Sequence, residues 1–309
     1  MISLKLRHPS KAATDIFIGC VGYESRSSEA LRTYETSKAS TDKLILDYCC
    51  SGRLSYPENK KFILSIDCDL YKNTSDLISA IKDRIIGTKK KSVMLDVTSL
   101  DRRVMAKILE VLFDLREFIS NVEIIYYPQT FVEPMAVLEQ VLTFAPVTSR
   151  FVGEASYSRD ALSLIIGAGY EYGRIVGAID VLEPERVYCF HPVGTDSRFE
   201  EAIYKNNLGF SFLDNPDFLL PYDLLSPDEL YLSLRGLIEV ELRERDVLLL
   251  PLGPKIFAAI SIVIALQLSP SVMVWRHSTT SHSKPSTNLD AVASGNRIDF
   301  SFSFSDAAN

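Results

Sequence analysis

Short runs of β-branched and aromatic residues alternate along the chain with longer stretches in which apolar residues recur every three or four positions. The first pattern is typical of strands and the second of amphipathic helices. Strands are predicted near 15–20, 43–49, 62–67, 92–96 and 122–127 in the first half, and near 162–167, 185–190, 209–213, 246–250 and 271–275 in the second. Helices are predicted at 25–38, 74–86, 99–119, 171–182, 197–207, 226–244 and 254–268. This alternation predicts βαβ units, and therefore an α/β protein with parallel sheets.

The two halves of the chain match each other element by element at an offset of about 147 residues. "DIFIGCVGYE" corresponds to "LSLIIGAGYE", and "KSVMLDVTSLDRRVMAKILEVLF" corresponds to "RDVLLLPLGPKIFAAISIVIAL". A period of this length is too long for a solenoid repeat and fits two tandem domains. We therefore predict two Rossmann-like, doubly wound parallel-sheet domains that arose by internal duplication, one over residues 1–140 and one over residues 155–275.

The segments outside the two repeats are polar or rich in proline. Prolines mark a junction at 128–160, which has room for a helix at 133–144. Residues 276–309 read as a polar tail, in which "RIDFSFSFS" alternates at period two. This alternation predicts an edge strand, with a half-ordered terminus as the alternative.

Composition and charge narrow the classes of protein. The chain has 309 residues, of which 47% are hydrophobic and 24% charged, as in a folded globular protein rather than a disordered one. Its net charge of −7 and pI near 5.3 do not indicate the basic surface that binds duplex nucleic acid. The N-terminus lacks a signal-peptide pattern, and the apolar stretch 256–268 is too short to span a bilayer. A cytoplasmic protein without membrane contact is expected.

The five cysteines and four histidines show no metal-binding spacing. No pair of cysteines forms Cys-x-x-Cys, and an odd number fits free thiols in a reducing compartment. Cys20 is expected in the core, and the histidines that follow predicted strands, His191 and His277, are expected on the surface. We predict no metal site.

Unusual residues follow the first and fourth predicted strands of each half. After the first strands come Gly22, Tyr23, Glu24 and Arg26, and then Gly169, Tyr170, Glu171 and Arg174. After the fourth strands come Asp96, Thr98, Ser99 and Arg102, and then Gly253 and Lys255. Doubly wound sheets bind ligands beyond the carboxyl ends of these two strands, where the strand order reverses. We therefore predict these residues as ligand-binding.

The residue types favour an anionic, nucleotide-type ligand. Glycines allow a tight turn, and the start of a helix offers free N–H groups to a phosphate. Thr98 and Ser99 would donate hydroxyl hydrogen bonds or cap a helix, and the tyrosines would stack on bases. The cations of the four turns are expected to be exposed and to contribute little to folding. The alternative is structural, with the glycines only shaping turns and the glutamates only favouring helix starts.

Known phosphate motifs fit only in part. The chain has no Gly-x-x-x-x-Gly-Lys-Ser/Thr loop, which excludes an ordinary P-loop NTPase. The second half has Gly167, Gly169 and Gly173, a Gly-x-Gly-x-x-x-Gly relative of the dinucleotide turn, but no acidic residue after its second strand, which ends at His191. The first half has Asp47 at the equivalent place but fewer glycines. Neither half carries the whole NAD-binding signature, so the sequence does not identify a cofactor.

The segment "DVTSLDRRVM" resembles the fourth-strand motif of CRISPR-associated Rossmann-fold (CARF) domains, in Asp96, Thr98 and Arg102. Two CARF-like units in one chain resemble the related SAVED domains. "SLDRR" stands where that family usually has glycine, and the second half has "PLGPK" without Asp-x-Thr. The resemblance implies a sensor of oligonucleotide second messengers that belongs to a bacterial antiviral defence system. It further implies that the sensor works with a partner protein or as a homo-oligomer.

Two other classes of function stay open. The same strand ends carry groups for a nucleotide- or NAD-processing hydrolase: Glu24, Glu171, Asp96 with Asp101, Cys20, His191 and His277. Their spacing does not assemble a catalytic triad. A scaffold subunit without a small ligand is the third class.

Overall fold

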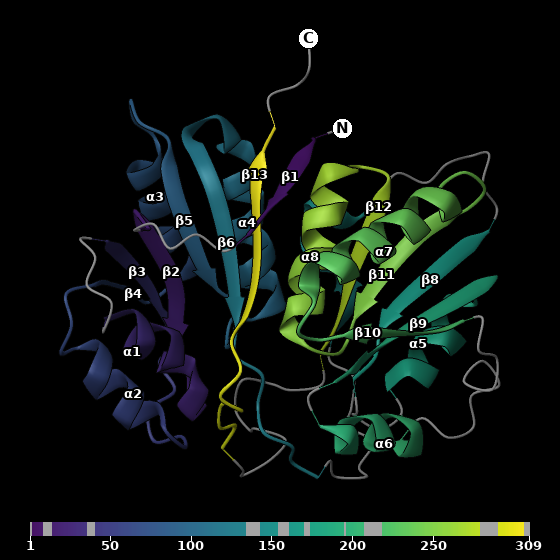
Figure 1. Cartoon of the computed structure of the whole chain (residues 1–309), viewed down its shortest axis with the longest axis horizontal. Helices are drawn as coiled ribbons and strands as arrows, with labels where there is room; N and C mark the ends of the chain where they lie inside the picture. Colours follow the sequence, from purple (N-terminus) through teal and green to yellow (C-terminus); the bar gives the residue numbers. More distant parts are fainter. Residues whose placement is uncertain are drawn as a thin grey trace. The chain divides into compact units, whose positions relative to one another are not determined.

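The computed structural model describes residues 2–8, 14–35, 41–133, 143–153, 161–169, 174–194, 196–206, 218–278 and 290–305 (Figure 1). The chain divides into two compact units. The first unit combines Ile2–Thr130 with Thr287–Asn309, and the second unit is Phe131–Ser286. The C-terminal residues, which the sequence assigns to a tail, therefore belong to the same unit as the N-terminal half.

The first unit contains a seven-stranded mixed sheet in the order β1-β13-β6-β5-β2-β3-β4. Its strands are β1 (Leu4–Arg7), β2 (Ile16–Val21), β3 (Asp42–Asp47), β4 (Asp69–Tyr71), β5 (Lys91–Asp96), β6 (Ile119–Tyr126) and β13 (Ile298–Phe304). The strands from β2 to β6 are parallel, while β13 pairs antiparallel with β6 and with β1. The strand predicted in "RIDFSFSFS" therefore forms as β13, but the prediction that it lies at an edge is wrong, because it has a partner strand on each side. The strand order reverses between β2 and β5, so the loops after these two strands emerge side by side.

Helices and short 3-10 turns connect the strands of the first unit. They are η1 (Ser25–Ser28), α1 (Glu29–Glu35), α2 (Tyr56–Ile63), α3 (Thr74–Ile85), α4 (Arg102–Asp114) and η2 (Arg116–Phe118). α4 begins where Asp101 accepts the N–H groups of Arg103 (2.8 Å) and Val104 (3.4 Å), which is the usual role of an N-cap aspartate. Its apolar side is buried, so the helix forms by amphipathic packing on the sheet.

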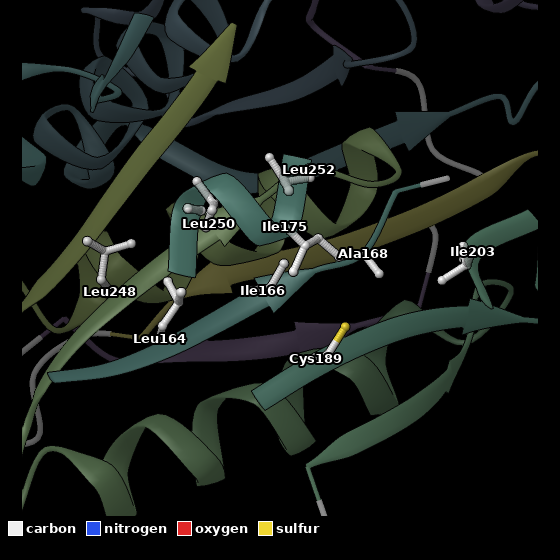
Figure 2. Close-up of a cluster of buried hydrophobic side chains, with 10 residues drawn as sticks. Leu164, Ile166, Ala168, Ile175, Cys189, Ile203, Leu248, Leu250 and Leu252 are labelled. Atoms are coloured by element: carbon white, nitrogen blue, oxygen red, sulfur yellow. The ribbon is translucent and has the colours of Figure 1, made fainter. Parts of the chain in front are cut away.

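The second unit contains a six-stranded sheet in the order β10-β9-β8-β11-β12-β7. Its strands are β7 (Thr143–Pro146), β8 (Leu162–Gly167), β9 (Arg186–Val193), β10 (Leu219–Asp223), β11 (Asp246–Pro251) and β12 (Val272–Ser278). Its helices are η3 (Ser149–Phe151), α5 (Arg174–Leu182), α6 (Ser197–Asn206), α7 (Pro227–Glu241) and α8 (Lys255–Gln267). Figure 2 shows the apolar cluster that strands β8, β9 and β11 form with α5 and α6.

The predicted α/β class is confirmed, and the sheets are mixed rather than wholly parallel. In both units the five parallel strands follow the order third, second, first, fourth, fifth, and antiparallel strands are added beyond the fifth. The predicted strand at 62–67 is wrong, because 56–63 forms α2 and the strand follows as β4. A short apolar run does not distinguish strand from helix, and here the buried positions recur at helical spacing. The predicted strand 209–213 lies outside the described residues.

Other expectations fall partly on residues that the structure does not describe. Most of the helix predicted at 133–144 lies outside the described residues, and its last two positions belong to β7. The long apolar stretch near 256–268 forms α8, a buried helix of 13 residues. Within the described ranges, no helix is both long enough and apolar enough to cross a membrane.

Candidate functional site

The turn after β2 is held in place by a buried amide. Asn59 on α2 is 2% exposed and donates from Nδ2 to the carbonyl oxygens of Gly22 (3.2 Å) and Glu24 (2.8 Å). The same nitrogen lies 3.0 Å from Oγ of Ser27, which in turn accepts the N–H of Gly22 at 3.2 Å. These bonds fix the backbone of the turn in the folded protein. Sequence reasoning missed Asn59 because α2 itself was not predicted.

Arg26 lies inside the first unit, so the prediction of an exposed cation is wrong for this residue. Its side chain is 7% exposed. Nε donates to Oε2 of Glu24 (3.0 Å), and Nη1 donates to the carbonyl oxygen of Tyr127 (3.0 Å). Burial alone would lower the pKa of Arg26, but the nearby Glu24 carboxylate outweighs it and raises that pKa. Arg26 therefore stays charged and connects the turn to the end of β6.

The loops after β2 and β5 meet at Glu24 and Ser99. The Ser99 hydroxyl donates to Oε2 of Glu24 at 3.3 Å, the same oxygen that accepts from Arg26. Both side chains are half-exposed. This contact lies where the strand order of the sheet reverses. It offers a hydroxyl and a carboxylate oxygen to a polar ligand.

The Asp-x-Thr segment after β5 shapes the end of the sheet. Asp96 is 4% exposed, and its Oδ1 accepts the N–H of Thr98 at 2.9 Å. Thr98 is fully buried, and its Oγ1 accepts the N–H of Tyr127 at 3.0 Å. The helix cap that was expected from the Thr-Ser pair is supplied by Asp101 instead. Asp96 and Thr98 thus hold the β5 loop against β6.

Half-buried side chains surround this point. The guanidinium of Arg53 lies over the ring of Tyr23, 5.8 Å from its centroid. The phenolic oxygen of Tyr48, at the end of β3, accepts the N–H of Asp101 at 2.8 Å and so reaches the start of α4. Burial raises the pKa of Tyr48 well above its ordinary value, which keeps the phenol neutral. Arg102, the first residue of α4, is half-buried next to this bond.

The acidic residue at the end of β3 is occupied by protein groups. Asp47 is 4% exposed, and its Oδ1 accepts the hydroxyl of Tyr56 at 2.7 Å. Its Oδ2 forms a short ion pair with Nζ of Lys60. In dinucleotide-binding domains an acid at this place binds the ribose. Here both carboxylate oxygens hold α2 against the sheet, which favours a structural role.

In the second unit the equivalent loops are joined by backbone bonds. The carbonyl oxygen of Gly167 accepts the N–H groups of Leu252 (2.9 Å) and Gly253 (2.8 Å). A Cβ at Gly253 would lie far inside contact distance of the Ala168 carbonyl oxygen, so glycine is needed there for close approach. The strand ends of this unit are therefore in direct contact through their main chains.

The other predicted residues of the second unit are only partly described. Gly169 is buried after β8, and Lys255 is half-buried at the start of α8. Arg174 begins α5, but its side chain lies outside the description, as do Tyr170 and Glu171.

The candidate catalytic residues outside the turns are buried. His191 and His277 are 6% and 8% exposed, so the expectation of surface histidines is wrong. Burial lowers the pKa of His191, although Glu200 acts in the opposite direction. Cys20, 3% exposed, lies in the core as predicted. Within the part of the chain that the structure describes, no group of three His, Cys, Asp or Glu side chains is arranged to hold a metal ion.

One further contact at the turn after β2 could not be predicted from any sequence pattern. The carboxylate of Asp290, which precedes β13 in the chain, accepts the N–H of Ser25 at 2.7 Å. The candidate site of the first unit is therefore built from the loops after β2, β3 and β5 together with this C-terminal segment. Neither the protein-family models nor the curated proteins contain a match to the chain.

Proposed function

We propose that the protein is a sensor-like module that binds a nucleotide-type ligand at the carboxyl ends of β2 and β5 in the first unit. The observation that carries the proposal is the contact between Ser99 and Glu24 at the point where the strand order reverses. Open α/β sheets bind their ligands at this point. The resemblance of residues 96–102 to CARF domains extends the proposal to an oligonucleotide second messenger and to a subunit of a bacterial antiviral defence system.

The chemistry of the surrounding side chains supports a ligand with both an anionic and an aromatic part. Arg102 is half-buried beside Asp101 and would carry the positive charge, a role that the buried Arg26 does not fill. The ring of Tyr23 is half-buried, and its accessible part would stack on a base beside the guanidinium of Arg53. The ligand contacts that we propose are therefore Tyr23, Ser99 and Arg102.

We further propose that the two units descend from one duplicated domain, and that only the first kept the ligand site. The shared order of the five parallel strands supports common descent. The loss is supported by the backbone bonds from Leu252 and Gly253 to Gly167, which draw the loop after β11 onto the end of β8. The second unit would then contribute stability or a surface for a partner protein.

The direct test is a binding panel with product analysis. The full chain would be titrated by calorimetry with cyclic oligonucleotides, NAD and nucleoside triphosphates, and each mixture would then be examined by mass spectrometry. A sensor binds one class and leaves it unchanged. Conversion of the ligand would favour the hydrolase, and a panel without binding would favour the scaffold subunit.

Two neighbouring arginines test whether the ligand binds at the proposed position. Arg102→Ala removes a charge-assisted bond to an anionic ligand, and we expect its affinity to fall about tenfold or more. Arg103→Ala is the matched control, because Arg103 is exposed on the next position of the same helix. Equal losses in both variants would mean that the effect is only long-range charge, and the proposed contact would be abandoned.

A further inference from the structure

The two chain connections between the units are paired with each other. The chain passes from the first unit to the second after Thr130 and returns at Thr287. Within the first unit, the N–H of Thr130 donates to the carbonyl oxygen of Val292 at 2.9 Å, and the N–H of Ser294 donates to that of Pro128 at 2.9 Å. Gln129 and Ala293 form an antiparallel bridge between these bonds. We call residues 128–130 and 292–294 the crossover pair.

The crossover pair continues directly into the turn after β2. The Asp290 carboxylate accepts the N–H of Ser25 (2.7 Å) through one oxygen and the hydroxyl of Ser55 through the other. The carbonyl oxygen of Ala291, a residue that is 7% exposed, accepts the Ser25 hydroxyl (3.1 Å) and the N–H of Arg26 (3.3 Å). Four hydrogen bonds thus join two adjacent C-terminal residues to the loops after β2 and β3.

A second link joins the turn to the other strand of the crossover pair. Nη1 of Arg26 donates to the carbonyl oxygen of Tyr127, which directly precedes Pro128. The turn therefore holds both chain connections, one through Asp290 and Ala291 and the other through Arg26. Any displacement of the turn must break bonds to both or move both with it.

We infer that these contacts form a coupling device, in which Asp290 clamps the ligand-binding turn to the crossover pair. The effect of a ligand on this device rests on the proposed function, because a ligand in contact with Tyr23 and Ser99 would lie close to Ser25, two positions after Tyr23. An anionic ligand there repels the Asp290 carboxylate, so binding loosens the clamp and with it the pairing of residues 128–130 with 292–294. Coupling between two sites is reciprocal, so loosening the crossover pair also loosens the turn.

Hydrogen exchange on the ligand-free chain tests the coupling from the turn side. Ser55→Ala removes one donor to Asp290 and lies far in sequence from both connections. We expect amide exchange in peptides containing Thr130 and Ser294 to rise about two- to tenfold, the effect of one lost hydrogen bond. Ser65→Ala is the matched control, because Ser55 precedes α2 and Ser65 is an exposed serine just after it. It should leave the exchange rates of those peptides unchanged.

The reverse experiment starts from the crossover pair. Thr130→Pro removes the N–H that bonds to Val292, and we expect faster exchange in the peptide containing Ser25 and Arg26. An effect confined to the altered segment in either variant would overturn the coupling, as would a rise spread equally over β2 and β5. Neither measurement uses a ligand, so the coupling can fail while ligand binding stands, and the reverse.

Discussion

The backbone N–H of Ser25 donates to the carboxylate of Asp290 at 2.7 Å, across 265 positions of the chain. A negative charge from the C-terminal segment thus lies at the turn where an anionic ligand is proposed. Together with the bonds from Asn59 to the carbonyl oxygens of Gly22 and Glu24, this contact gives much of the turn's backbone a partner in the folded chain. Residues of this turn therefore divide into those that build it and those that remain half-exposed beside it, and the two groups predict different results on mutation.

Arg26 belongs to the first group, and Arg26→Ala should destabilise the first unit. The substitution leaves Glu24 without its ion-pair partner and the Tyr127 carbonyl without a donor. Removing one partner of a buried pair costs several kcal/mol, and since Glu24 is 23% exposed we expect about 2–3 kcal/mol here. Chemical denaturation followed by far-UV circular dichroism measures the loss. Arg103→Ala, on the exposed side of α4, should stay within about 0.5 kcal/mol.

Arg26→Lys separates charge from geometry. Lysine keeps the positive charge but lacks the planar fork that reaches Glu24 and Tyr127 at once. We therefore expect it to recover less than half of the stability lost in the alanine variant. Full recovery would show that the charge alone holds the turn, contrary to the hydrogen-bonded role described above.

Asn59 offers a second test of the same turn through two substitutions. Asn59→Ala removes donors to two carbonyl oxygens and should cost about 1–3 kcal/mol. Asn59→Asp has nearly the same shape but places acceptors against acceptors, so it should cost more than alanine at neutral pH. Denaturation at pH 7 compares the two. If aspartate proved the milder change, Nδ2 would not be the group that matters.

The fold follows from local patterns more closely than the site does. The β2 and β8 strands, each followed by a glycine-containing turn, are visible in the sequence because parallel strands bury both faces. α2 was missed because its apolar end joins the following residues in a strand-like run. Its buried positions are Tyr56, Asn59 and Ile63, and a polar residue among them weakens the helical pattern.

The site depends on contacts that no local pattern contains. Spacing after the strands identified Glu24 and Ser99, which do meet, because the strand order of a doubly wound sheet is predictable. Burial of Arg26 required the carbonyl of Tyr127, which comes from the end of β6. The contact of Asp290 required β13 to return beside β6, and an alternating pattern of phenylalanine and serine predicts a strand without naming its neighbour.

A buried glutamate should make the second unit sensitive to acid. Glu241 is 2% exposed and accepts the hydroxyls of Ser163 and of Tyr188, the latter at 2.8 Å. Burial raises the pKa of Glu241, but these bonds, together with the charges of Arg186 and Arg245, outweigh it and the pKa is lowered. A lowered folded pKa contributes stability that is present above the unfolded value of about 4.3 and is lost as pH falls through the folded value.

Glu241→Gln should weaken the pH dependence of the free energy of unfolding below about pH 4.3. It should also lower that free energy by about 1–3 kcal/mol at pH 7. Trp275 is the only tryptophan of the chain and lies on β12, so its fluorescence reports the second unit alone. Urea unfolding between pH 3 and pH 7 gives both values. Glu239→Gln, whose partner Arg235 lies one turn away on the surface of α7, is the control and should keep the wild-type slope. If the free energy of unfolding depended on pH equally in Glu241→Gln and the wild type, Glu241 would not be the source of the acid sensitivity.

Two glycines of the second unit should respond to alanine with opposite signs. At Gly253 the added Cβ meets the carbonyl oxygen of Ala168, which is main chain and cannot rotate away. The loop after β11 would have to retreat and break its bond to Gly167, so we expect a loss of about 1–3 kcal/mol. At Gly236, inside α7, a Cβ meets nothing within 4 Å, and removing the entropy cost of glycine should stabilise by about 0.5–1 kcal/mol. Trp275 fluorescence during urea unfolding measures both variants in the same unit. An unchanged free energy of unfolding in Gly253→Ala would show that the two loops do not need their close approach. The proposal that the second unit has lost its ligand site would then lose its support.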